Sequence, residues 1–186
     1  LVAGIDVDET IEEVAAEFDG VEGYVADVRD HERIREVVDD VEERADVVAV
    51  VNNAAISRYE WIGDLGPEEW HEVMDVNLTG QYNSVHAAGP RMFERGRGAI
   101  VNVSSGAGKQ GSASGGVHYS ASKAGVFGLT TGLYGPARGT TISRSFPRND
   151  GAAIGATLAA GSLGSAILPF LAGSLALAGI FPFAGF

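Results

Sequence analysis

The chain has 186 residues with 25 Asp or Glu, 13 Lys or Arg and no cysteine, so its formal net charge is −12. This length suits one domain, or one domain with an appendage, and a hydrophobic fraction of 45% is enough to build a buried core. The negative charge argues against a nucleic-acid partner, and the absence of cysteine excludes a disulfide scaffold and a cysteine nucleophile. We expect a cytoplasmic protein.

Short apolar segments alternate with amphipathic segments along most of the chain. In chain order they predict a strand at 1–5, a helix at 9–18, a strand at 21–28, a helix through 34–41, a strand at 46–51, a helix at 70–92, a strand at 99–103 and a helix at 119–133. Apolar strands that alternate with amphipathic helices indicate parallel βαβ units covered on both faces. The predicted fold class is α/β, with a doubly wound parallel sheet.

Polar residues follow four of the predicted strands, where ligands bind in such sheets. They are Asp6, Asp27, the pair at 52–53 and the pair at 104–105. Each of them alone is also typical of an ordinary turn. No histidine spacing indicates a metal site, and the glycine-containing stretch 106–116 is predicted to be a flexible loop.

Tyr119 and Lys123 lie four residues apart on a predicted helix, so they share one face. An ammonium near a phenol favours the phenolate, and such a pair can exchange a proton with an alcohol or a carbonyl. Ser105 follows a strand and could donate a hydrogen bond to the carbonyl oxygen. A tyrosine four residues before a lysine is also common as an ordinary surface pair.

Four sequence segments stand in the order and spacing of one known family: NNAA at 52–55, DVNLTG at 75–80, VNVSSGAG at 101–108 and YSASKAGVFGLTTGL at 119–133. Over about residues 1–133 the chain resembles the short-chain dehydrogenase/reductase family. The resemblance implies a Rossmann-type domain and an NAD(P)-dependent oxidoreductase, acting on a small-molecule secondary alcohol or ketone and forming a homo-oligomer when complete. The hydride belongs to the cofactor.

The same resemblance implies a catalytic set of Asn77, Ser105, Tyr119 and Lys123. Tyr119 is then the general acid/base, and Lys123 stabilises its phenolate and holds the nicotinamide ribose. Ser105 orients the substrate oxygen, and Asn77 supports a water molecule in a proton relay.

The expected cofactor is NAD rather than NADP. Asp6 ends the strand whose carboxylate in Rossmann folds accepts hydrogen bonds from the ribose 2′-hydroxyl, and a carboxylate repels a 2′-phosphate. By resemblance, Asp27 and Val28 contact the adenine. By the same resemblance, Asn52, Ala54 and Ala55 belong to the segment that runs beneath the adenosine ribose.

The resemblance is incomplete at the N-terminus. The glycine-rich turn that cradles the pyrophosphate normally lies about 20 residues before the acidic ribose ligand, and only five residues precede Asp6. We therefore expect the first βα unit, which includes a central strand, to be missing from the fold. The strands that end at Asp6 and Asn52 would then either pair directly or leave backbone groups unpaired.

The C-terminal end departs from the family more strongly. We expect a partial NAD-binding and catalytic domain at 1–150 and a separate tail at 151–186, which has no charged residue and in which 20 of 36 residues are Gly, Ala or Ser. The tail is compatible with a membrane segment or hydrophobic hairpin, with a buried helix at a dimer interface, or with an end that was joined or read in another frame. The alternative to an enzyme is a noncatalytic fragment that binds no cofactor and is attached to a membrane through this tail.

Overall fold

A computed structural model describes the backbone of residues 1–145 and the side chains of residues 1–133. The chain divides into two units, Leu1–Leu133 and Tyr134–Phe186, and the fold and the candidate site belong to the first. The tail predicted at 151–186 lies outside the described residues, together with its membrane, interface and joined-end alternatives.

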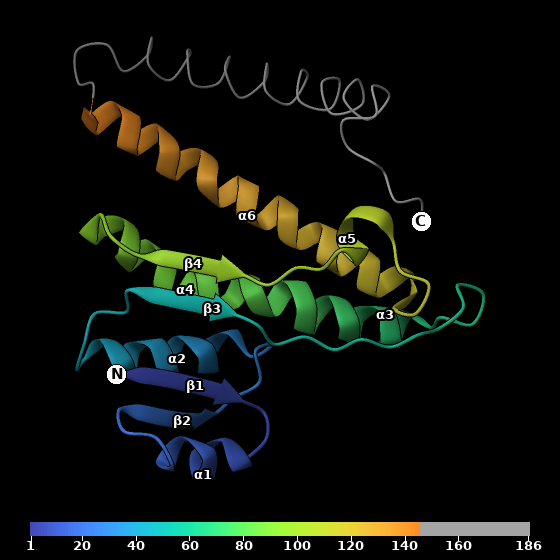
Figure 1. Cartoon of the computed structure of the whole chain (residues 1–186), viewed down its shortest axis with the longest axis horizontal. Coiled ribbons are helices and arrows are strands. Elements are labelled where there is room, and N and C mark those ends of the chain that lie inside the picture. The colour runs from blue at the N-terminus through green and yellow to red at the C-terminus, as the bar shows by residue number, and fades with distance from the viewer. Residues whose placement is uncertain (146–186) are drawn as a thin grey trace, which may run out of the picture. The chain divides into compact units, whose positions relative to one another are not determined.

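The described elements alternate between strands and helices, as predicted (Figure 1). In chain order they are β1 (Val2–Asp6), α1 (Thr10–Ala16), β2 (Val21–Val25), α2 (His31–Glu42), β3 (Ala49–Asn52), α3 (Pro67–Met74), the π-helical turn η1 (Asp75–Thr79), α4 (Gly80–Arg95), β4 (Ala99–Asn102), α5 (Ala107–Gln110) and α6 (Gly116–Ser145). The loop predicted at 106–116 is wrong over α5, because the Gly106 carbonyl accepts hydrogen bonds from the amides of Lys109 and Gln110 at 2.9 and 3.1 Å.

The four described strands form two separate parallel pairs. β1 pairs with β2 in a register that runs from Val2 opposite Val21, and β3 pairs with β4 from Ala49 opposite Ala99. Among the described strands, β1 and β3 do not pair with each other. The sequence left two outcomes open, direct pairing of β1 with β3 or edges without a partner strand. The structure shows the second of these among the described strands.

Helices α2 and α4 cover one face of these strands and build the core. The apolar spacing that predicted α2 places Ile34, Val37 and Val38 against the strands. Helix α4 contributes the second half of the cluster with Ala87, Ala88 and Met92, and the partly buried Ile5, Tyr24, Val28, Val47, Val50 and Ile100 pack against it. Helix α2 begins after Asp30, whose side chain accepts a hydrogen bond from the amide of Arg33 at 3.0 Å. This cap satisfies one of the free amides of the first turn.

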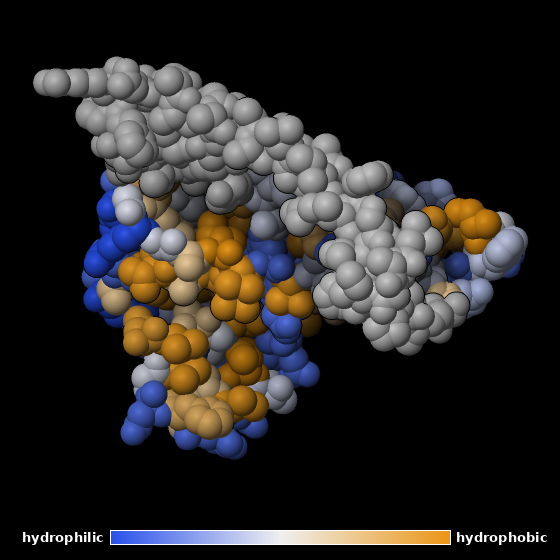
Figure 2. All heavy atoms as spheres, turned by 45° about the horizontal axis from the view of Figure 1, so that its top comes forward, coloured by the Kyte–Doolittle hydropathy of each residue, from blue (hydrophilic) through white to orange (hydrophobic). Residues whose placement is uncertain are grey.

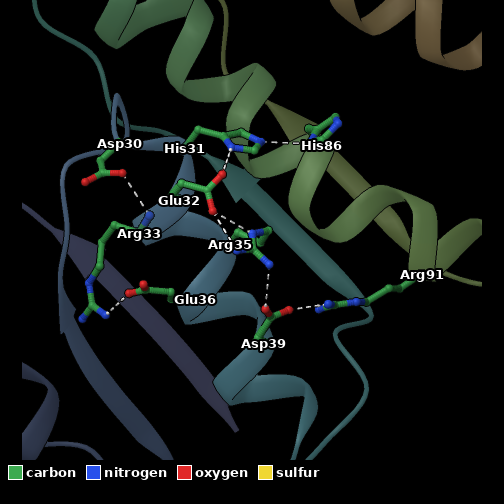
Figure 3. A network of polar contacts seen from close by, with 9 residues as sticks. All are labelled: Asp30, His31, Glu32, Arg33, Arg35, Glu36, Asp39, His86 and Arg91. Atoms are coloured by element: carbon green, nitrogen blue, oxygen red, sulfur yellow. Dashed lines mark hydrogen bonds and ion pairs between the residues drawn. The ribbon is translucent and has the colours of Figure 1, made fainter.

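A polar network also connects α2 to α4 (Figure 3). The Nε2 atom of His31 lies 2.9 Å from the Nδ1 atom of His86, and Arg91 of α4 pairs with Asp39 of α2. Arg35 pairs with Asp39 at 3.6 Å within α2. These groups are largely solvent-exposed, and each such ion pair contributes only about 0–1 kcal/mol. The packing of the apolar faces therefore holds the two helices together.

Candidate active site

Asn77 lies in η1, between α3 and α4, and its side chain is completely buried. Its Oδ1 atom accepts a hydrogen bond from the Ile56 amide at 2.8 Å, and its Nδ2 atom donates to the Ile56 carbonyl at 2.9 Å. The Nδ2 atom also donates to the Ser122 hydroxyl at 3.1 Å. Asn77 thus joins the loop after β3 to helix α6, and π-helical turns often occur at functional sites.

Lys123 is buried in α6 with only 2% of its surface exposed. Its Nζ atom donates a hydrogen bond to the Val103 carbonyl at 3.0 Å and lies 5.8 Å from the centre of the Tyr119 ring. Burial lowers the pKa of the Lys123 ammonium. An ammonium has three N–H donors, and the described residues supply one hydrogen-bond acceptor for them. The other donors fit an additional ligand oxygen.

The pH dependence of folding tests this burial. The pKa of Lys123 is lower in the folded chain than in the unfolded chain, where it has its ordinary value of 10.5. Between these two pKa values the unfolded chain binds more protons, so the free energy of unfolding rises with pH. We expect Lys123→Met to remove this alkaline rise, and urea unfolding of the chain at a series of alkaline pH values measures it. The exposed Lys109 provides the control, because Lys109→Met should keep the rise; identical pH profiles for the two variants would contradict the assignment.

The loop after β4 is held against α6 next to Lys123. The Ser104 hydroxyl donates to the Lys123 carbonyl at 2.7 Å, and a Cβ atom added at Gly108 would lie 2.6 Å from the Lys123 carbonyl carbon. Ser105, between these contacts, is half-buried, and its hydroxyl oxygen accepts a hydrogen bond from the Ala107 amide at 3.2 Å. The loop therefore places Ser105 beside the helix that carries Tyr119 and Lys123.

Two glycine substitutions test this close contact. Gly108→Ala should destabilise the fold by about 1–3 kcal/mol, because the added methyl group meets the backbone of α6. Gly128 lies in α6, and nothing lies within 4 Å of a Cβ atom added there. Gly128→Ala should therefore stabilise the fold by about 0.5–1 kcal/mol. Urea unfolding midpoints measure both changes, and stabilisation by both substitutions would show that the loop does not contact α6.

The residues predicted to hold the adenosine half of a cofactor lie at the carboxyl ends of the strands. Asp6 is exposed at the end of β1, and its Oδ1 atom accepts a hydrogen bond from the Asp8 amide at 3.0 Å. Asn52 is buried at the end of β3, where its Nδ2 atom donates to Asn102 at 2.8 Å. The members of the predicted set that share the lining of one groove, between β1 and β3, are Asp6, Val28, Asn52 and Ala54.

Two members of the predicted set do not line this groove. Ala55 is exposed beyond it. The Asp27 carboxylate pairs with the Arg29 guanidinium at 2.6 Å, and its hydrogen bonds to Arg29 lower the pKa of Asp27. The structure therefore gives Asp27 a local partner, and its contact with a nucleotide base stays a prediction.

Three buried polar residues of the site were missed by the sequence analysis. Ser122 bonds Asn77 and lies three residues after Tyr119, a helical spacing that could have identified it. Asn83 donates to the Val28 carbonyl at 2.8 Å, and Gln81 donates to the Val103 carbonyl at 3.2 Å. No sequence signal separates these last two from exposed polar residues of α4, because their burial follows from the fold.

The described residues contain no group of three or more His, Cys, Asp or Glu side chains that could hold a metal ion. None of the helices described in this chain combines the length and the apolar character that crossing a bilayer needs.

Parallel strands whose carboxyl ends carry polar residues, alternating with helices, define the Rossmann type of α/β fold. The family profile described as short chain dehydrogenase matches residues 2–143. The chain belongs to this family, as the sequence resemblance indicated.

Two similar relatives have been assigned reductase activities. A 3-oxoacyl-[acyl-carrier-protein] reductase of Thermotoga maritima is 38% identical over 135 residues, which are 70% of this chain and 54% of the relative. An acetoacetyl-CoA reductase of Rhizobium meliloti is 45% identical over 100 residues, 53% of this chain and 41% of the relative. The chain thus spans about half the length of the curated relatives it matches.

Solved structures show the same fold. A 3-oxoacyl-[acyl-carrier protein] reductase from Brucella melitensis with bound NAD superposes with a TM-score of 0.66 at 34% identity, over 73% of this chain and 56% of the other. A gluconate 5-dehydrogenase from Burkholderia cenocepacia in complex with NADP and tartrate gives a TM-score of 0.65 at 31% identity, over 70% and 53%. The predicted Rossmann-type α/β class is therefore confirmed.

Proposed function

We propose that this protein is an oxidoreductase that transfers a hydride between a nicotinamide cofactor and a secondary alcohol or ketone in the cytoplasm. The observation that carries the proposal is the buried Lys123 ammonium, 5.8 Å from the Tyr119 ring on the same helix. Two of the similar proteins are named as a 3-oxoacyl-[acyl-carrier-protein] reductase and an acetoacetyl-CoA reductase, which favours a carbonyl compound as substrate.

The proposed reaction uses the Tyr119 hydroxyl as the proton donor to the substrate oxygen during reduction, and as the acceptor in the reverse direction. Lys123 stabilises the phenolate that forms when Tyr119 loses its proton. Ser105 donates a hydrogen bond to the same substrate oxygen, whose charge changes during the reaction. Asn77 holds the loop at Ile56 and the helix at Ser122 in place, and its contact with a relay water stays a prediction.

The described residues fit the two nucleoside ends of a nicotinamide cofactor. Lys123 has N–H donors beyond its hydrogen bond to Val103, and Asp6 offers an exposed carboxylate on the groove that Ala54 also lines. When bound, such a cofactor supplies or accepts the hydride. The glycines that follow β4, at 106, 108 and 111, surround the four-residue helix α5, which is much shorter than the helix that follows the pyrophosphate cradle in Rossmann folds. These residues support a preference for NAD over NADP, because Asp6 would repel a 2′-phosphate.

The proposal is tested in a chain extended at its N-terminus by the strand, glycine-rich turn and helix that the family resemblance predicts before Leu1. We call this protein the extended chain. It should oxidise NADH in the presence of a small ketone or an acetoacetyl thioester, with saturation in both reactants, as the loss of NADH absorbance would show. A folded extended chain that binds NADH but reduces none of these carbonyl compounds would disprove the proposed activity.

Cofactor choice gives a separate prediction. Asp6→Ala in the extended chain should weaken NADH binding by about 10- to 100-fold, because it removes charge-assisted hydrogen bonds to the ribose. It should also reduce the discrimination against NADPH, as fluorescence titration with both cofactors would measure. Asp8→Ala, two residues away, should change neither affinity. Equal affinities of the unsubstituted extended chain for NADH and NADPH would show that Asp6 is only a turn residue.

The open groove between β1 and β3 favours a second candidate function for residues 1–186. In that case the chain is a noncatalytic member of the family that keeps Tyr119 and Lys123 but binds no cofactor. Titration of the chain with NADH distinguishes the two candidates. Membrane attachment through 151–186, which formed part of this alternative, has no support among the described residues.

A further inference from the structure

His118 is a buried polar residue that the proposed reaction does not use. It lies in the first turn of α6, directly before Tyr119, and its side chain is completely buried. Neither its Nδ1 atom nor its Nε2 atom has a hydrogen-bond partner among the described residues. A neutral imidazole has one N–H donor and one acceptor nitrogen, and buried polar groups in folded proteins are nearly always paired. The position of this ring therefore calls for a partner or a role.

The chain buries this polar ring although apolar side chains remain at its surface. Val51 is 65% exposed and Val101 is 52% exposed, and Figure 2 shows hydrophobic residues gathered in a broad patch on the visible side of the described part. An apolar residue in place of His118 would fill the interior without leaving a polar group unpaired. The burial of apolar surface therefore does not explain why an imidazole lies there.

A carboxylate lies close to the buried imidazole. The Oε1 atom of Glu69, in the first turn of α3, is 3.9 Å from the His118 Nε2 atom. This distance exceeds the length of an N–H···O hydrogen bond by about 1 Å. The Glu69 side chain is 29% exposed, so it has room to make this shift by rotating about its own bonds.

The turn that begins α6 holds the imidazole in place. Gly116 has a φ of +68°, and a Cβ atom added there would lie 2.6 Å from the His118 Cε1 atom and 3.1 Å from the Arg58 carbonyl oxygen. The ring is therefore packed where the start of α6 meets the connection between β3 and α3. The Arg58 guanidinium of that connection pairs with Glu72 at 3.0 Å. Among the described residues, Glu69 is the charged group within ion-pair distance of His118.

Tyr119 is held by contacts of the same turn. A Cβ atom added at Gly115 would lie 2.7 Å from the Tyr119 Cδ1 atom, and the Tyr119 carbonyl accepts a hydrogen bond from the Ser122 hydroxyl at 2.8 Å. Consecutive residues of an α-helix point about 100° apart, so His118 and Tyr119 project in different directions. An effect of His118 on Tyr119 therefore passes through the backbone of α6.

We propose that His118 is a positioning residue for Tyr119: its Nε2–H group donates a hydrogen bond to the Glu69 carboxylate and so holds the first turn of α6 against α3. The inference rests on the proposed oxidoreductase function, in which Tyr119 exchanges the proton. Misplacement of a reacting group by about 1 Å can lower a rate by about 10²-fold. Loss of this bond should therefore lower kcat, while Lys123 and Asp6 continue to bind the cofactor.

The bond itself is tested in residues 1–186 by NMR of the chain with isotope-labelled histidines, which shows the ring nitrogen that carries the proton. We expect the His118 proton on Nε2, and its exchange with solvent should be at least about ten-fold faster in Glu69→Ala. Glu68→Ala, at the adjacent residue of α3, is the control and should leave the exchange unchanged. A proton on Nδ1 alone, or equal exchange in the two variants, would overturn the proposal.

The effect on catalysis is tested in the extended chain. His118→Phe keeps a ring of similar shape and removes both nitrogens, so kcat should fall about 10- to 100-fold while KM for NADH stays within about two-fold. The urea unfolding midpoint should not fall, because an apolar ring leaves no unpaired polar group at this position. Loss of turnover without loss of stability separates positioning from a merely structural role.

His118→Gln is the conservative variant, because its amide nitrogen can donate to Glu69. It should restore kcat to within about three-fold of the unsubstituted extended chain. His71→Phe, at an exposed residue of α3, is the matched control and should change neither kcat nor KM. Normal kcat of His118→Phe in an active extended chain would overturn the role of His118 alone. An extended chain without activity would overturn the proposed function, and this role with it.

Discussion

Tyr119→Phe is expected to lower kcat of the extended chain by at least about 10²-fold, the range that general acid/base catalysis contributes. The substitution removes the proposed proton donor and keeps the ring, which lies 5.8 Å from the Lys123 Nζ atom. Cofactor affinity should change little, because the substitution leaves Lys123 and Asp6 in place. Steady-state kinetics of ketone reduction and an NADH titration measure the two effects separately.

Tyr59→Phe provides a matched control for this prediction. Tyr59 is 61% exposed in the connection between β3 and α3. Its hydroxyl should be dispensable for turnover. Near-normal kcat of the Tyr119→Phe variant would remove Tyr119 from the mechanism, whereas equal losses for both variants would indicate a general effect on the fold.

Residues 1–186 alone are expected to show no saturable NADH binding. The groove between β1 and β3 separates Asp6 from Asn52, and the glycine-rich turn after β4 leads only to the four-residue helix α5, whereas pyrophosphate is bound at the N-terminus of a full helix. Fluorescence titration at NADH concentrations up to the millimolar range measures this. The extended chain should bind in the same assay, which shows that the assay detects binding.

Micromolar NADH binding by residues 1–186 would contradict this prediction. It would also rule out the noncatalytic candidate function and show that the fold tolerates an open sheet. Failure of the extended chain to bind would instead count against the proposed cofactor site itself.

The sequence predicted the elements and the fold class correctly where a periodic pattern of apolar residues or the end of a strand could be recognised. The spacing of Ile34, Val37 and Val38 predicted α2 and its buried face, and the alternation of elements predicted the fold class. These features depend on local chain geometry, which the order of residues specifies directly.

The features that the sequence did not predict depend on contacts between distant segments. Among the described residues, the hydrogen-bond acceptor of Lys123 is the Val103 carbonyl, a backbone atom 20 residues away. Gln81 and Asn83 are polar residues of a helix whose burial depends on which face meets the strands. Helix α5 was predicted as loop because the segment GSASGG follows the glycines at 106 and 108; in the structure, hydrogen bonds to the Gly106 carbonyl form a short helix before that segment.

The π-helical turn η1 also sets the rotational phase between α3 and α4. An α-helix advances about 100° per residue, so the one additional residue that a π-turn contains rotates everything that follows by that amount. Helix α3 buries Val73, and α4 buries Val85, Ala88 and Met92. The turn between the two helices sets the direction in which each of these apolar stripes faces. Removing one residue from Asp75–Thr79 would bring the two helices back into a single continuous phase. It would turn either the apolar stripe of α4 or the Asn77 side chain away from its partners. The burial of the Asn77 amide and the packing of α4 therefore both depend on the same additional residue.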